Sequence, residues 1–129
     1  MPFHNHNYRE NSEKAVMYSL NQPYIKGIEC DIRLTKDNEI VLLHNLVIDL
    51  ISDGTGVVHN LTLKELLNYN FSNEKITVLS QLLSKIYTNK IILLEIKEER
   101  TDVIDNWIEA LTKIIQKYGY DKITANVKK

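Results

Sequence analysis

Two acidic residues, one position apart, are the first feature of this sequence that could do chemistry. Glu29 and Asp31 lie within residues 25–35, where apolar residues alternate with polar ones. This period of two predicts a β-strand, and residues i and i+2 of a strand project from the same face. Paired carboxylates form a hard oxygen site suited to Mg²⁺ or Ca²⁺. The alternative is the ordinary exposed polar face of a half-buried strand.

A second polar pair follows an apolar run. Residues 91–94 predict a strand buried on both faces, and Glu95 and Lys97 emerge together at its carboxyl end. Ligands bind at that end of the strands in open α/β sheets and in α/β barrels. Glu95 could therefore add a third carboxylate to a metal, and Lys97 could hold a phosphate oxygen as a point charge. The alternative is a simple ion pair at the end of a strand.

A histidine is the third candidate. His44 follows the apolar residues 40–43, which predict another strand. An imidazole at the same edge could act as a general acid or base, or it could cap the strand by bonding a backbone carbonyl. Three strand ends would then bring polar groups to one edge, as in barrel enzymes. The remaining histidines are expected at a loose terminus, His4 and His6, or on a solvated loop, His59.

The elements that must position these residues are predicted to alternate between strands and helices. Helices are expected over residues 10–21, 62–68, 79–87 and 101–118, and strands over residues 25–35, 39–44, 90–97 and 122–127. The last helix should pack through Val103, Ile104, Trp107, Leu111 and Ile114. This alternation favours an α/β fold, a parallel sheet covered by helices. The short connection over residues 36–38 would also permit a hairpin, so the pattern alone leaves the topology open.

Composition narrows the class of protein. The chain has 129 residues, 43% hydrophobic and 26% charged, which is typical of one soluble domain. A net charge of -1 gives no indication of a nucleic-acid partner. No apolar run approaches the roughly 20 residues of a membrane span, and no secretory signal is visible. Cys30 is the one cysteine, which excludes an internal disulfide and favours a cytoplasmic location.

Six segments of the sequence resemble, in order and spacing, the glycerophosphodiester phosphodiesterases, which are (β/α)₈ barrels. The segments are Glu10-Asn11-Ser12, residues 27–32 with their Glu-x-Asp pattern, residues 34–37 with 41–44, Thr55-Gly56 with residues 61–66, residues 76–83, and Leu94-Glu95-Ile96-Lys97. The resemblance implies a single partial domain over residues 1–129. That domain would contain about strands 2 to 5 of the eight in this TIM-type barrel.

The resemblance also implies a role for each candidate residue. Glu29, Asp31 and Glu95 would hold one divalent cation, Mg²⁺ or Ca²⁺. His44 would be one of two catalytic histidines and would protonate the leaving alkoxide, and Lys97 would contact the phosphate. The implied reaction is hydrolysis of a glycerophosphodiester to glycerol 3-phosphate and an alcohol. The implied partner is thus a small-molecule phosphodiester.

The sequence also departs from the family pattern. It lacks the His-Arg-Gly motif at the end of the family's first strand, and with it one catalytic histidine and a phosphate-binding arginine. Asn45 follows His44 where the family usually has Asp, and the last three barrel strands have no counterpart. We therefore expect a truncated chain that is weakly active or inactive alone; the alternative is a non-catalytic metal- or phosphate-binding remnant. Open sheet edges predict self-association or a complementing chain.

Overall fold

The computed structural model describes residues 11–86, 90–118 and 123–128. The elements are α1 (Glu13–Leu20), β1 (Gly27–Leu34), β2 (Ile40–Leu42), the 3₁₀ helix η1 (Val58–Asn60), α2 (Leu63–Leu66), β3 (Thr77–Val78), α3 (Leu79–Ser84), β4 (Ile91–Lys97), α4 (Ile104–Tyr118) and β5 (Ile123–Lys128). All eight predicted helices and strands are present. The sequence analysis missed β3, because two residues are too short to show a period. His4 and His6 lie outside the described residues.

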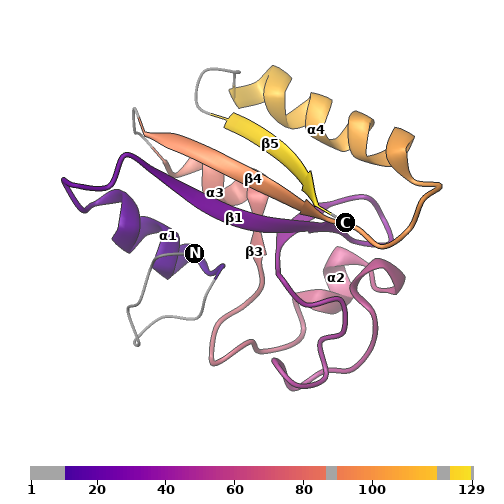
Figure 1. Cartoon of the computed structure of the whole chain (residues 1–129). Helices are drawn as coiled ribbons and strands as arrows, with labels where there is room; N and C mark the ends of the chain where they lie inside the picture. The colour runs from indigo at the N-terminus through magenta and orange to yellow at the C-terminus, as the bar shows by residue number, and fades with distance from the viewer. Residues whose placement is uncertain (1–10, 87–89, 119–122, 129) are drawn as a thin grey trace.

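Five strands form one mixed sheet in the order β3-β2-β1-β4-β5. β1, β4 and β5 are parallel, and Figure 1 shows them side by side. β2 is antiparallel to β1, with Leu42 opposite Ile32, and β3 is antiparallel to β2. The hairpin alternative is therefore correct for residues 39–44. An entirely parallel sheet of the four predicted strands is wrong, because the turn after β1 is too short to return the chain in parallel.

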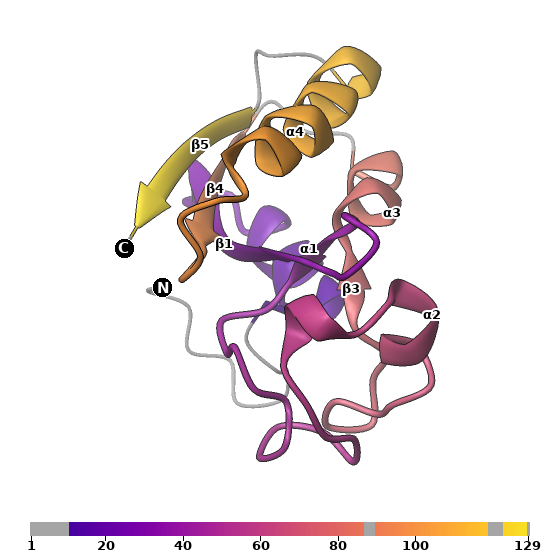
Figure 2. The same ribbon diagram turned by 90° about the vertical axis from the view of Figure 1, so that its right-hand side faces the viewer.

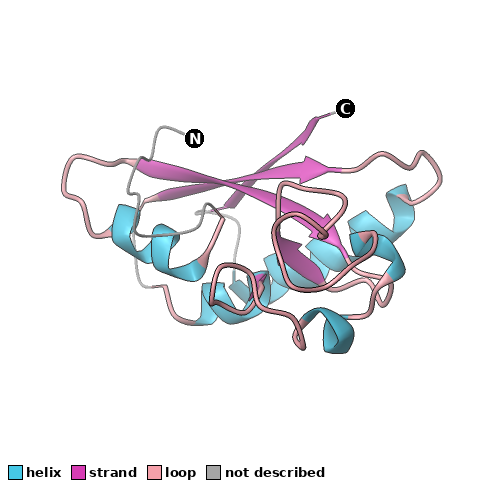
Figure 3. Cartoon of the chain, turned by 90° about the horizontal axis from the view of Figure 1, so that it is seen from below, coloured by secondary structure: helices cyan, strands magenta, loops and turns pink. Residues whose placement is uncertain are grey.

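Helices α1, α3 and α4 cover one face of the sheet (Figures 1 and 3). The core on that face is built from every second residue of β1 and β4 together with apolar residues of the helices. Its residues from β1 and β4 are Ile28, Cys30, Ile32, Leu34, Ile92, Leu94 and Ile96, and β2 adds Ile40 and Leu42. The opposite face of these strands carries the polar candidates, so strand alternation separates the core from the site. Every helix in residues 11–86, 90–118 and 123–128 is too short or too polar to cross a bilayer.

The long helix α4 packs on the sheet largely as predicted. Trp107 is only 4% exposed, and Ala110 and Ile114 are also buried. Ile104 is 69% exposed, so its predicted place in the core is wrong. Successive residues of a helix are rotated by about 100°, and the stripe that includes Val103, Trp107 and Ile114 leaves Ile104 to one side.

A second, smaller core lies beneath the long connection between β2 and β3. It contains Val41, Leu43, Ile48, Val58, Leu66, Phe71 and Ile76. A capping box begins α2, since the Thr62 side chain accepts from the Glu65 amide and the Glu65 side chain accepts from the Thr62 amide. Figure 2 shows α2 and the adjoining loops beside β3, away from β5. This small core holds the end of β2, and hence His44, in place.

One side of β1 is only partly paired. β2 pairs with residues 32–34, and no strand of the described part of the chain pairs with residues 27–30 on that side. The predicted open edge near residues 25–35 is therefore present over the described residues. Self-association or a complementing chain at this edge stays a prediction.

Candidate metal and phosphate site

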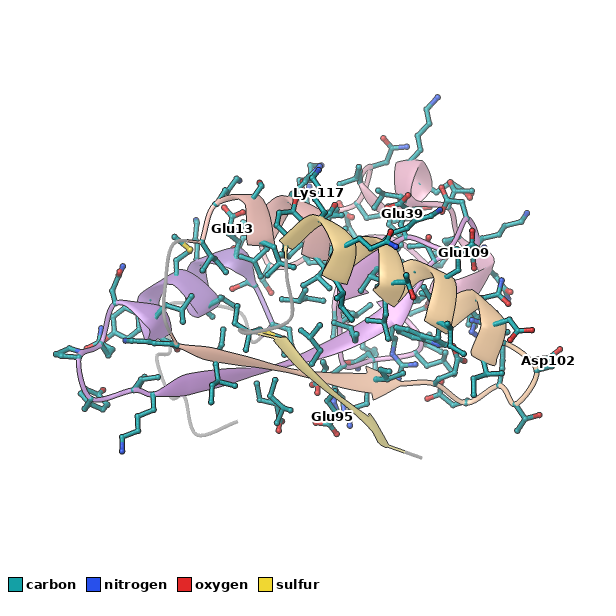
Figure 4. The ribbon with its side chains drawn as sticks, turned by 90° about the horizontal axis from the view of Figure 1, so that it is seen from above. Glu13, Glu39, Glu95, Asp102, Glu109 and Lys117 are labelled. Atoms are coloured by element: carbon teal, nitrogen blue, oxygen red, sulfur yellow. The ribbon has the colours of Figure 1, made fainter. Side chains whose placement is uncertain are left out.

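The register of β1 and β4 brings three carboxylates together. Asp31 lies opposite Glu95 in the parallel pairing, and Glu29 projects from the same face two residues earlier. One carboxylate oxygen from each residue lies within 4.8 Å of the others. Asp31 and Glu95 are 8% and 5% exposed, which is unusual for carboxylates. Figure 4 shows Glu95 on the side of the sheet away from α4, so the predicted convergence of the three acids is confirmed.

The spacing of these oxygens fits one divalent cation. Ca²⁺ sits about 2.3–2.6 Å from each oxygen ligand, so two ligands on opposite sides are about 4.6–5.2 Å apart. The observed limit of 4.8 Å allows all three oxygens to reach one ion after small side-chain adjustments. A set made only of carboxylates suits Mg²⁺ or Ca²⁺ rather than a softer metal.

The cluster is crowded with negative charge. Burial, then a side-chain hydrogen bond with Glu95 and its charge, raise the pKa of Glu29. Lys97 Nζ lies 2.9 Å from Glu95 Oε1, which is the ion pair that the sequence analysis gave as the alternative. That hydrogen bond with Glu95 raises the pKa of Lys97, which keeps the lysine charged. The charge of Lys97 alone does not balance three carboxylates, so a further cation would be stabilised here.

Asn11 holds Asp31 in place. The Asn11 carboxamide bonds both the side chain and the backbone of Asp31. Its Nδ2 donates to Asp31 Oδ2 at 3.1 Å, and its Oδ1 accepts from the Asp31 amide at 2.9 Å. Asn11 has a φ of 59°, in the left-handed region that asparagine tolerates better than most residues. It directly precedes Ser12, the N-cap of α1, which accepts from the Ala15 amide. The sequence analysis gave Asn11 no role, because only the fold brings this turn to β1.

His44 reaches the cluster through the β1–β2 hairpin. The Leu43 amide donates to the Asp31 carbonyl at 2.9 Å, which places the next residue beside the Asp31 side chain. His44 Nδ1 lies 3.2 Å from Asp31 Oδ2, and the imidazole is 63% exposed. An ionised carboxylate only accepts, so beside ionised Asp31 the hydrogen of this bond lies on Nδ1, and Nε2 takes no part in it. Its partner here is thus a carboxylate and not the backbone carbonyl of the capping alternative.

An open cavity of about 700 Å³ adjoins His44 and Lys97. Arg33 and Glu99 also line it, together with Trp107 of α4. The volume lies within the range of about 300–1,000 Å³ usual for small-molecule sites. Neither Arg33 nor Glu99 was predicted at the site. An arginine two residues after Asp31 on the same strand face was the available signal.

Comparison with known proteins agrees with this geometry. A model of the glycerophosphoryl diester phosphodiesterase family matches residues 4–126, and the chain belongs to this family. A glycerophosphodiester phosphodiesterase of Caldanaerobacter subterraneus is 30% identical over 105 residues, covering 74% of this chain and 43% of that protein. The resemblance on which the sequence analysis relied is therefore confirmed.

Solved structures show the same fold. The glycerophosphodiester phosphodiesterase of Thermotoga maritima is similar with a TM-score of 0.75 at 26% identity, over 94% of this chain and 49% of that one. A phosphodiesterase of Oleispira antarctica, solved with the product sn-glycerol-3-phosphate, gives a TM-score of 0.76 at 19% identity, over 91% of this chain and 50% of that one. The chain thus spans about half the length of these relatives.

Proposed function

We propose that this chain carries the cation- and phosphate-binding part of a phosphodiesterase. The reaction would be hydrolysis of a glycerophosphodiester to glycerol 3-phosphate and an alcohol. The observation that carries the proposal is the convergence of Glu29, Asp31 and Glu95 with His44 and Lys97 on the face of the sheet that the helices leave open. Family membership and the relative solved with sn-glycerol-3-phosphate support the same chemistry.

Each residue has a distinct task in the proposed reaction. The three carboxylates would hold a divalent cation, which supplies charge neutralisation on the phosphoryl oxygens. Lys97, now paired with Glu95, is within reach of the same space and would contact a phosphate oxygen. His44 would keep Nδ1 on Asp31 and protonate the leaving alkoxide from Nε2.

We infer that the sheet is part of a (β/α)₈ barrel, over a single domain. β1, β4 and β5 would be neighbouring barrel strands, with the open face turned toward the interior of the barrel. Three parallel strands covered by helices on one face support this inference, as does the similarity to the solved phosphodiesterases. The hairpin strand β2 would lie outside the parallel set. Three parallel strands are one fewer than the expected strands 2 to 5.

A non-catalytic site that binds a metal or phosphate is the second candidate. The family resemblance calls for two catalytic histidines, and His44 is the one histidine for which the described residues show a hydrogen bond to the carboxylate cluster. The other described histidine, His59, lies on the 3₁₀ helix η1. Such a site would bind the cation and glycerol 3-phosphate without turnover.

Release of glycerol 3-phosphate from glycerophosphocholine distinguishes the two candidates. With Mg²⁺ or Ca²⁺, we expect slow release by the 129-residue chain, and release at least about 10²-fold slower for His44→Ala, which loses the general acid. His59→Ala is the matched control and should keep the wild-type rate. Binding of glycerol 3-phosphate without any turnover would favour the non-catalytic site. Turnover that survives both His44→Ala and chelation of the metal would contradict the proposed reaction.

A further inference from the structure

Arg33 occupies the position after Asp31 on the same face of β1, and its side chain is only 7% exposed. All five N–H groups of its guanidinium have an acceptor. Nε and Nη2 donate to the His44 carbonyl at 3.0 and 2.7 Å, Nη1 donates to the Lys97 carbonyl at 3.3 Å, and Nη1 and Nη2 donate to the two carboxylate oxygens of Glu99 at 2.7 and 3.1 Å. Arg33 therefore has no N–H left for a phosphate.

The two carbonyls that Arg33 binds belong to the two residues proposed to meet the substrate. His44 lies just past the end of β2, and Lys97 is the last residue of β4, so each stands where the strand ladder stops. These chain ends come from opposite sides of β1, since β2 and β4 flank it. A single planar guanidinium that bonds both carbonyls fixes the distance between the two backbones.

Glu99 fixes the orientation of Arg33. It binds the guanidinium through both carboxylate oxygens, a fork-to-fork arrangement that sets the plane of the group. It also neutralises a charge that would otherwise be buried against carbonyls alone. The hydrogen bond from Arg33 lowers the pKa of Glu99, so the carboxylate stays ionised at neutral pH.

We propose that Arg33, oriented by Glu99, is a positioning residue that holds the general acid His44 and the phosphate ligand Lys97 at a fixed separation. The inference rests on the proposed function for the tasks of His44 and Lys97. In the described contacts Arg33 bonds none of the three carboxylates of the cation site, and its five N–H groups all go to protein acceptors. It acts through the backbone of the two residues that do the chemistry.

Arg33→Lys is the variant that tests this role. Lysine keeps the charge, but it cannot bond two carbonyls and a carboxylate from one rigid plane. Glu99→Gln is the second variant, which keeps the arginine and removes its orienting charge. Arg100→Lys is the matched control, because Arg100 makes a similar pair with Glu98 at 3.0 Å in the same loop and has no described bond to His44 or Lys97.

The first readout needs no activity. Carbonyl ¹³C shifts of the labelled chain report hydrogen bonds to the carbonyl oxygens. In Arg33→Lys we expect the His44 and Lys97 signals to move together, with smaller movements in the same direction for Glu99→Gln and none for Arg100→Lys. If only one signal moves, or if the control moves both, Arg33 does not couple the two residues and the inference is wrong.

The second readout is the affinity for glycerol 3-phosphate, measured by calorimetry with saturating Ca²⁺. We expect Arg33→Lys to bind it about 10- to 100-fold more weakly, as for other residues that orient a ligand-binding group. Affinity for Ca²⁺ alone should change less than about threefold, because the carboxylates do not touch Arg33. A wild-type chain that binds no glycerol 3-phosphate would contradict the proposed function, while the carbonyl shifts would still test the coupling. Equal affinity in the wild type and Arg33→Lys would overturn the positioning role.

Discussion

Two groups of acidic residues lie at the same end of the sheet, and they are paired very differently. Glu98 accepts hydrogen bonds from the backbone and guanidinium of Arg100 and from Trp107 Nε1, and these bonds outweigh burial and lower its pKa to about 2. Glu99 is bound through both oxygens by Arg33. In the carboxylate cluster the direction is reversed, since burial and the neighbouring Glu95 raise the pKa of Glu29.

The difference distinguishes carboxylates that stabilise the fold from carboxylates proposed to bind a cation. Glu98 and Glu99 each have a guanidinium, so their charges stabilise the loop between β4 and α4. The three clustered carboxylates share Lys97, together with polar contacts from Asn11 and His44. Their charges repel one another, and a bound cation would relieve that repulsion, as expected of the metal site proposed above. Removing a charge from the paired group should therefore lower the free energy of unfolding, whereas removing one from the metal-free cluster at Glu29 should raise it.

The largest effect is expected for the loss of a cation ligand. A cation at 100 times its dissociation constant stabilises the fold by about 2.7 kcal/mol, which raises the melting temperature by roughly 10 °C in a chain of this size. Asp31→Asn should lower the affinity for Ca²⁺ by about 10²-fold or more and remove most of that rise. Thermal unfolding with Ca²⁺ and with a chelator measures both. Glu109→Gln, on the exposed face of α4, is the control with the same loss of charge. If Ca²⁺ raises the melting temperature of Asp31→Asn as much as that of the wild type, the cation site is excluded.

A smaller effect is expected where the carboxylate is already paired. Glu98→Gln should lower the free energy of unfolding by about 2–3 kcal/mol, because Arg100 loses its ionic partner. Since folding lowers the pKa of Glu98 from 4.5 to about 2, its stabilisation is complete above pH 4.5 and is lost as the pH falls toward 2. Urea unfolding at pH 6 and pH 2.5 should thus show a difference between wild type and Glu98→Gln that shrinks with acid. A difference independent of pH would contradict this account of the loop.

The smallest expected effect is a gain in stability. Folding raises the pKa of Glu29, so the ionised side chain destabilises the metal-free protein at pH 7, and this penalty disappears as the pH falls through the raised pKa. Glu29→Gln should therefore be more stable than wild type without a cation, by less than about 1 kcal/mol, and should bind Ca²⁺ more weakly. Chemical unfolding with a chelator and calorimetric titration give the two values. A Glu29→Gln variant that is less stable and binds Ca²⁺ normally would show that repulsion does not shape this cluster.

The strands and their polar ends could be predicted because both signals are local. Alternation in β1 and the apolar run of β4 indicate strands, and the strand period alone places Glu29 and Asp31 on one face. The parallel register then brings Glu95 opposite Asp31, as expected for neighbouring strand ends. Ile104 was misplaced because an apolar residue beside a core stripe gives the same local signal as one within it.

The sequence by itself determined the α/β alternation, the family and the chemical types at the site: three carboxylates, an imidazole and a lysine. Tertiary structure alone decided that residues 39–44 return as a hairpin, that Asn11 clamps Asp31, and that Arg33 joins the backbones of His44 and Lys97. The physical reason is range. Strand period and burial depend on neighbouring residues, whereas the Asn11–Asp31 and Arg33–Lys97 bonds join residues 20 and 64 positions apart. The direction of the strand after the short turn, and which donor meets which acceptor, follow from the packing of the whole sheet.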